Sequence, residues 1–206
     1  MFGNNPFASP PAGGRKAARS AATRAQLMAA ATRLFAERGY AGVGTEEIVR
    51  EAGVSRGALY HHFADKRELF AAVHERLEEQ VTQRIMESGA GLHEPWALIL
   101  NGMRAYLDAC TDPAVGRITL IEAPAVLGWQ EWREVDARHG LRLLSTALQV
   151  AMDAGLLAEQ PVEPLAQLLL AAMAEAGLMV ATAADPGSTR VAVEGPLLAL
   201  LEGLRA

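Results

Sequence analysis

The sequence has very little cysteine: Cys110 is the one cysteine among 206 residues, so no disulfide can form within the chain. Low cysteine usage is typical of proteins in a reducing compartment. No apolar stretch follows the basic residues Arg15, Lys16 and Arg19, so the pattern of a secretory signal peptide is missing. We therefore expect a cytoplasmic protein.

Recognisable catalytic and metal-binding patterns are also missing. The C-terminal part holds scattered glutamates and a widely separated pair of histidines, His93 and His139, besides His74, without a hydrolase motif or a phosphate-binding glycine loop. The adjacent His61 and His62 would point about 100° apart on a helix, and neither has a cysteine or carboxylate at metal-ligand spacing. We expect neither an enzyme nor a bound metal or cofactor.

Strand patterns are absent, because no stretch alternates apolar and polar residues over the length of a strand. Hydrophobic residues make up 50% of the chain, which excludes general disorder. The spacing of the apolar residues predicts an all-α protein of about nine helices, with Gly39 ending the first and Pro124 and Gly128 interrupting the chain after the sixth. The expected helices cover about 20–38, 45–52, 55–62, 65–88, 96–110, 112–123, 130–154, 163–184 and 188–205.

Charge divides the chain into two parts. Residues 1–67 carry ten Lys and Arg against five Asp and Glu, whereas residues 68–206 carry nine against nineteen. A basic N-terminal part and an acidic C-terminal part indicate two modules with different partners. Residues 1–18 contain three glycines and three prolines without apolar periodicity, and we expect a disordered arm there.

One stretch, residues 165–184, is long and apolar enough to span a membrane. Gln167 and Glu175 argue against a span, since an acid at the centre costs about 2.5–3.5 kcal/mol. We therefore expect no membrane partner and a helix buried between others. Glu175 then either pairs across a dimer interface or faces a cavity. Cys110, on the apolar face of its helix, is expected to be a small core residue.

Residues 44–70 carry the most informative pattern, two short helices joined by a tight turn at Gly53. This is the helix-turn-helix pattern. Ala52 and Gly53 are small because the two helices must approach closely at the turn. Ser55 is placed to cap the second helix, whose N-terminus would enter the major groove of DNA.

The polar residues of this second helix suit contacts with DNA. Arg56 can reach a phosphate or a guanine edge, and Tyr60 and His61 can donate to phosphate or touch base methyl groups. Lys66, at the start of the fourth helix, can pair with a backbone phosphate. The free N–H groups at the helix N-terminus also favour phosphate.

The segment GTEEIVREAGVSRGALYHHFADKRELF, with TRAQLMAAATRLFAERGYAG before it, resembles the DNA-binding domain of the tetracycline-repressor (TetR) family of transcriptional regulators. The resemblance is strong over about residues 23–75. It implies a DNA-binding domain at 19–67 and a C-terminal ligand-binding and dimerisation domain at 68–206. The implied partners are a palindromic double-stranded DNA operator, a second copy of the chain and a small-molecule inducer.

The chain departs from the family pattern at Val43 and Gly44, where the family usually has Thr or Ser. Glycine at an N-cap costs only a few tenths of a kcal/mol relative to serine, so the fold should persist. A phosphate contact is either lost or moved to Thr45. The expected DNA-contacting residues are Thr45, Ser55, Arg56, Gly57, Tyr60, His61 and Lys66.

The last two helices, about 163–184 and 188–205, are too apolar for one buried face each. Two such pairs can form a four-helix interface across a two-fold axis, so we expect an obligate homodimer.

Within the C-terminal domain we expect an apolar cavity of roughly a few hundred Å³ between the fourth, fifth, seventh and eighth helices, suited to an apolar or aromatic effector. The candidate ligand-binding residues are Trp96, Met103, Tyr106, Glu122, Trp129, Trp132 and His139. The alternative is a filled core, in which the same aromatics simply pack. The protein would then be a constitutive regulator or an activator without a ligand.

Overall fold

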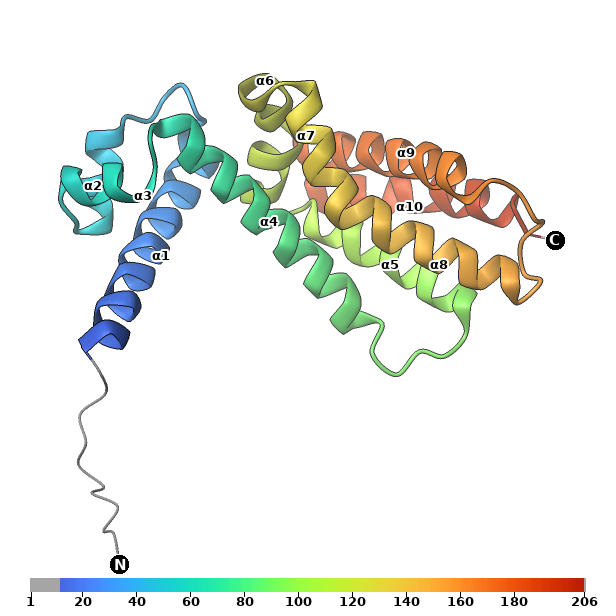
Figure 1. Cartoon of the computed structure of the whole chain (residues 1–206). Helices are drawn as coiled ribbons and strands as arrows, with labels where there is room; N and C mark the ends of the chain where they lie inside the picture. The colour runs from blue at the N-terminus through green and yellow to red at the C-terminus, as the bar shows by residue number, and fades with distance from the viewer. Residues whose placement is uncertain (1–11, 206) are drawn as a thin grey trace, which may run out of the picture.

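The computed structural model describes residues 12–205, and within that range the chain is helical without strands (Figure 1). Adjoining α-helical and π-helical segments run on into nine continuous helices, as the sequence predicts. The segments are α1 (Ala12–Arg38), α2 (Thr45–Ala52), α3 (Arg56–His62), α4 (Lys66–Ser88), α5 (Pro95–Ala109), η1 (Val115–Glu122), α6 (Ala123–Leu127), α7 (Trp129–Asp136), η2 (Ala137–Leu141), α8 (Arg142–Asp153), α9 (Val162–Thr182) and α10 (Pro186–Glu202).

Helix α1 begins at Ala12 rather than near Ser20. Residues 1–11 of the expected disordered arm lie outside the described residues, but residues 12–18 are helical, contrary to the prediction. The physical reason is that five of these seven residues are alanine, arginine or lysine, which are good helix formers and offset the poorer Gly13 and Gly14. Extending an existing helix avoids the cost of nucleation.

Helices α1, α2 and α3 form one unit at one end of the molecule (Figure 1). Phe35 of α1, Ile48 of α2 and Leu59 of α3 are completely buried in a shared core. The glycines at the turns have positive φ angles, 76° at Gly39 and 65° at Gly53. Only glycine adopts this conformation without strain, so these residues fix where α1 and α2 end.

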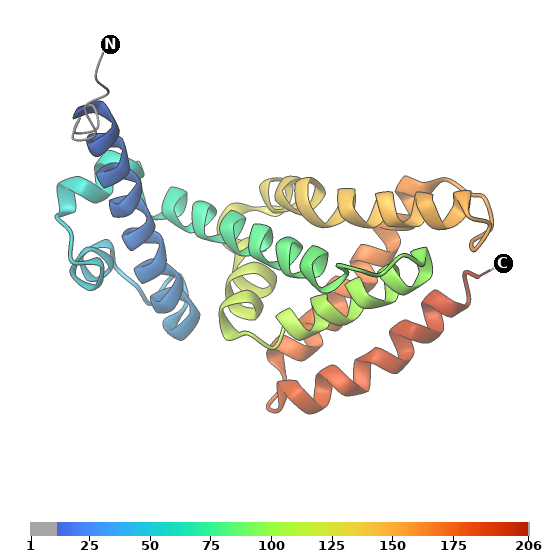
Figure 2. The same ribbon diagram turned by 90° about the horizontal axis from the view of Figure 1, so that it is seen from below.

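Helix α4 connects this unit to the rest of the molecule, as Figures 1 and 2 both show. Its first turns carry Leu69, Phe70 and Val73 into the core of α1–α3. Further along, Val81 packs with Ala109 in a separate cluster. The expected boundary at 67 and 68 therefore falls at the start of a helix that serves both cores.

The second unit surrounds α5, which contacts α4, α8, α9 and α10. The chain between α5 and α7 differs from the prediction at one proline. Pro124 lies in the first turn of α6 and continues the helix from η1. A π-helical turn already shifts the hydrogen-bond register, so the missing N–H of Pro124 interrupts no regular ladder. Gly128, with φ 85°, does end the helix.

Helix α9 is long and apolar enough to span a membrane by length and composition alone, and only 28% of its most apolar window is buried. The expectation of a helix buried between others is therefore wrong for the single chain. Its inner side packs on α10, η1, α8, α5 and η2. The opposite face is open and carries Leu168, Glu175 and Met179. Glu175 thus points outward and does not line the internal cavity.

Candidate nucleic-acid interface and internal cavity

The N-terminus of α3 forms an exposed tip. Ser55 caps it, because its Oγ accepts a hydrogen bond of 3.2 Å from the backbone N–H of Ala58. Ser55, Arg56 and Gly57 are all exposed. The first backbone N–H groups of a helix lack partners within it, and they carry the positive end of its dipole. The tip therefore offers a compact donor surface to an anion.

Arg56, Tyr60 and Thr45 lie together on this surface. The Arg56 guanidinium is 5.6 Å from the centre of the Tyr60 ring and 3.3 Å from the Glu46 carboxylate. The pKa of Tyr60 is lowered because Thr45, and then Arg56, hydrogen-bond to its hydroxyl. His61 is also exposed on the same helix. Six of the seven predicted residues therefore lie on one accessible surface of α2 and α3.

The seventh, Lys66, is engaged inside the unit. Its Nζ donates to the carbonyl oxygens of Tyr40 and Val43 at 2.9 and 3.0 Å and lies 4.0 Å from the centre of the Tyr40 ring. These contacts hold the turn between α1 and α2. Lys66 is half-buried, unlike the tip of α3.

The departure at Gly44 has the expected local effect. Gly44 is the N-cap of α2, and no side chain there accepts a hydrogen bond. Thr45 starts the helix and is half-buried. The helix persists because Ile48 anchors it in the core and because Glu46 and Glu47 favour its N-terminal dipole.

A cavity of about 400 Å³ lies inside the second unit. Its wall is contributed by α4, α5, η1, α7, η2, α8, α9 and α10. Its surface is mainly apolar, with Ile85, Met103, Leu144, Met173 and Leu197 among the lining residues. The four helices that were expected to bound the cavity do so, with η1 and α10 in addition.

Three of the predicted ligand-binding residues line this cavity: Met103, Tyr106 and Trp132. Trp96 and Trp129 do not. Trp96 is buried in the first turn of α5, where its Nε1 donates to Glu202 at 3.1 Å. Trp129 is 67% exposed because Gly128 turns the chain outward there.

Glu122 does not face the cavity either, because it contacts the end of α1. Its carboxylate accepts a hydrogen bond of 2.6 Å from the backbone N–H of Tyr40. On the same segment η1, Arg117 donates to the carbonyl oxygens of Ala36 and Glu37 at 3.1 and 2.7 Å. We call Arg117 and Glu122 the η1 clamp. It joins the second unit to the C-terminal end of α1.

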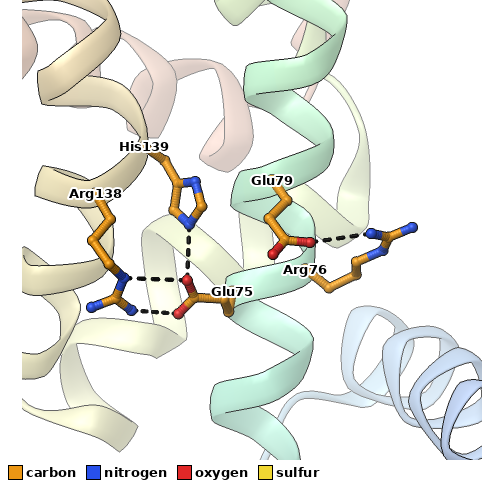
Figure 3. A network of polar contacts seen from close by, with 5 residues as sticks. All are labelled: Glu75, Arg76, Glu79, Arg138 and His139. Carbon is orange, nitrogen blue, oxygen red and sulfur yellow. Dashed lines mark hydrogen bonds and ion pairs between the residues drawn. The ribbon is translucent and has the colours of Figure 1, made fainter. Parts of the chain in front are cut away.

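His139 lies outside the cavity, in a polar network between α4 and η2 (Figure 3). Its Nε2 is 2.9 Å from Oε1 of Glu75, which also accepts from Arg138. Burial alone would raise the pKa of Glu75, but the hydrogen bonds from Arg138 and His139 outweigh it and lower this pKa. The three residues hold η2 against α4.

Sequence reasoning missed two acidic residues of the cavity wall, Glu78 and Asp136. Burial, and then the neighbouring Asp136 and Glu75, together raise the pKa of Glu78 to about 7. Burial also raises the pKa of Asp136, against the opposing effect of Arg133. A signal existed for Glu78, because it shares a helical face with Thr82, Ile85 and Met86, beside the apolar stripe that packs into the core.

Two family models match the chain. One, described as bacterial regulatory proteins of the tetR family, matches residues 27–73. The other, described as a tetracyclin repressor-like C-terminal domain, matches residues 96–204.

The chain is also similar to individual proteins of the same kind. A crystal structure of a TetR-family transcriptional regulator from Pectobacterium atrosepticum is 32% identical, with a TM-score of 0.79 over 92% of this chain and 97% of that one. The transposon Tn10 TetC protein of Escherichia coli is 29% identical over 57% of this chain and 59% of its own length. The regulator LmrA of Bacillus subtilis is 35% identical over 46% of this chain and 41% of its own length. The chain thus matches less than two thirds of the length of these last two relatives.

Proposed function

Because the chain belongs to the TetR family of DNA-binding transcriptional regulators, which are not enzymes, we propose that it is a cytoplasmic repressor released from a palindromic operator by a small molecule. Residues 19–67 bind DNA in this proposal, and residues 68–206 bind the effector and form the homodimer. The observation that carries it is that one chain holds an exposed α3 tip, an apolar cavity and a segment, η1, that contacts both units.

The DNA contacts in this proposal come from the α3 tip. Ser55 and Gly57 present backbone N–H groups to phosphate, and Arg56 reads a base edge or holds a phosphate. Tyr60 and His61 contact the adjacent backbone, and Thr45 supports them from α2. Lys66 holds the turn after α1 and thereby places α2 and α3.

The homodimer in this proposal forms through the open faces of α9 and α10. Leu168 and Val191 are 71% and 68% exposed, and Met179 is 50% exposed. An apolar surface of this kind marks an association site. A two-fold axis there would present two α3 helices to successive major grooves about 34 Å apart.

The cavity supports an effector over a filled core, because a mainly apolar cavity of about 400 Å³ has room for a small molecule. Effector and DNA sites would communicate through η1. Leu120 of η1 lines the cavity, and Trp132 both lines it and donates to the Thr119 carbonyl at 3.1 Å. The η1 clamp then reaches α1. A ligand that favours one arrangement of η1 would shift the population of α3 spacings.

The test begins with duplexes selected by the protein from a randomised pool, followed by fluorescence anisotropy with the selected sequence. Arg56→Ala should weaken binding by about 1–3 kcal/mol if Arg56 reads a base. The matched control is Arg84→Ala, which removes an exposed arginine from α4 far from the tip and should change binding little. Affinity should also fall steeply with salt.

Unchanged affinity in Arg56→Ala would overturn the assignment of the DNA site. Failure to enrich any sequence from the pool would overturn specific DNA binding by this chain.

A further inference from the structure

The cavity wall has an unusual balance of charge. Its lining residues include two carboxylates, Glu78 and Asp136, and no lysine, arginine or histidine. The rest of the polar surface comes from neutral groups such as Tyr106 and Thr82. An anionic ligand would find no cation in this wall. A neutral apolar ligand would offer neither carboxylate a hydrogen-bond donor.

Glu78 is the more informative of the two acids. Protein encloses it deeply, yet its side chain keeps some accessible surface because it faces the cavity. Among the described residues, no side chain or backbone donor hydrogen-bonds to its carboxylate, although Glu75 on the same helix has two donors. A buried carboxylate without donors is costly, so this group is suited to a partner that enters the cavity.

Asp136 enters the same space from α7. Among the described residues, its carboxylate has one ion pair, with Arg133, and this pair is loose at 3.8 Å. Among the described residues, no third His, Cys, Asp or Glu joins such a pair to make a metal site. The apolar wall likewise suits an organic cation better than a hydrated ion.

We propose that the effector of this protein is an amphiphilic amine, whose apolar body fills the cavity and whose protonated nitrogen is held by Glu78 and Asp136. This assignment deepens the proposed function and rests on it, since it names the class of molecule that would release the operator. The ammonium N–H groups would donate to the two carboxylates in a water-poor site, where charge-assisted hydrogen bonds are strong.

The release of a proton from Glu78 on binding gives a second, independent sign of an amine ligand. The titratable groups around Glu78 are Glu75 on its own helix, Asp136 on α7, and Tyr106 and Cys110 at the end of α5. Burial raises the pKa of Glu78 to about 7, so near pH 7 the group is partly protonated. A bound ammonium ion would stabilise the carboxylate, and the proton of Glu78 would be released to solvent.

The experiment uses three probes with one hydrocarbon body, measured by titration calorimetry on the full chain at pH 7. The probes are 4-phenylbutylamine, 4-phenyl-1-butanol and 4-phenylbutanoate. We expect the amine to bind about tenfold or more tightly than the alcohol, and the carboxylate to bind more weakly still. The heat of amine binding should differ between HEPES and Tris buffers, because a proton is released.

Variants assign the effect to the two acids. Glu78→Gln and Asp136→Asn should each weaken amine binding by about tenfold and leave alcohol binding within about twofold. The matched control is Glu79→Gln, because Glu79 is exposed on α4 and pairs with Arg76 at 3.1 Å outside the cavity (Figure 3).

Equal binding of amine and alcohol, tighter binding of the carboxylate, or no binding of any probe would overturn the amine assignment. Fluorescence anisotropy with the selected DNA duplex distinguishes a failure of the amine site from a failure of the proposed function. If the amine binds through Glu78 but leaves DNA affinity unchanged, the amine site stands and ligand-released repression fails. If the carboxylate binds and releases DNA, repression stands and the amine site fails.

Discussion

At the scale of the residue, the buried side chain of His74 on α4 is the clearest departure from ordinary packing. It is 1% exposed, and neither ring nitrogen has a hydrogen-bond partner among residues 12–205. Burial lowers its pKa to about 4, although the nearby Glu75 opposes this effect. The ring is therefore neutral in the folded protein at neutral pH. In the unfolded chain the same ring binds a proton near its ordinary pKa of 6.5.

The first prediction follows from that difference. Between pH 6.5 and 4 the unfolded state binds more protons at this position, so stability falls as the pH falls through this window. His74→Leu removes the effect. We compare the unfolding free energy of the variant with that of the wild type at each pH. The difference, variant minus wild type, should be about 1–2 kcal/mol larger at pH 5 than at pH 7.5. Urea denaturation at both pH values measures it, with His93→Leu on the surface as the control. A gain independent of pH would contradict the titration of His74.

At the scale of the element, η1 joins the two units. Glu122 holds the N–H that follows Gly39, and a Cβ at Gly39 would lie 2.3 Å from its Oε1. Arg117 supplies positive charge to the C-terminal carbonyls of α1, where the helix dipole is negative. Ile118 between them is completely buried in the core of α1–α3. The segment is thus part of the first core as well as the wall of the cavity.

We therefore predict that the η1 clamp makes the two units unfold together. The double variant Arg117→Ala, Glu122→Ala loses charge-assisted hydrogen bonds worth about 1.5–3 kcal/mol each. It should also expose the Tyr40 amide to faster hydrogen exchange. Urea unfolding should show one transition in the wild type and two in the double variant. Glu134→Ala on α7 provides an exposed comparison. A single unshifted transition with a protected Tyr40 amide would show that the clamp does not couple the units.

At the scale of the whole molecule, α9 and α10 leave apolar residues open on one side of the bundle, where Figure 2 shows α10 along its outer edge. Leu168, Glu175 and Met179 recur at helical spacing on the open face of α9. A single carboxylate in an otherwise apolar surface would need a partner if a second copy covered it. In the proposed dimer, the second copy covers this open surface of α9 and α10.

The third prediction concerns that surface. Leu168→Glu with Met179→Glu places four new charges in the proposed dimer interface, two from each copy, so the variant should sediment as a monomer at micromolar concentration. Operator binding should then weaken by at least about a hundredfold, because one subunit contacts one half-site. Leu92→Glu, in the exposed loop before α5, should stay dimeric. A double variant that remains dimeric would exclude α9 as the interface.

The sequence by itself determined what depends on near neighbours along the chain. The turns at Gly39 and Gly53, the cap at Ser55 and the helix-turn-helix pattern all follow from local backbone chemistry. The buried stripe of α5, including Met103 and Cys110, follows from periodicity. These features act within a few residues of each other, so the chain order displays them directly.

Only the tertiary structure decided which side chains face the cavity. Trp96, Glu122, Trp129 and His139 have the right chemistry for a ligand site, yet each meets another partner or solvent. Glu78 enters the wall instead. Helical periodicity gives the face of a residue but not the rotation of its helix against distant helices. That rotation is fixed by packing between segments far apart in sequence, and it alone brings Glu78 and Asp136 to the same space.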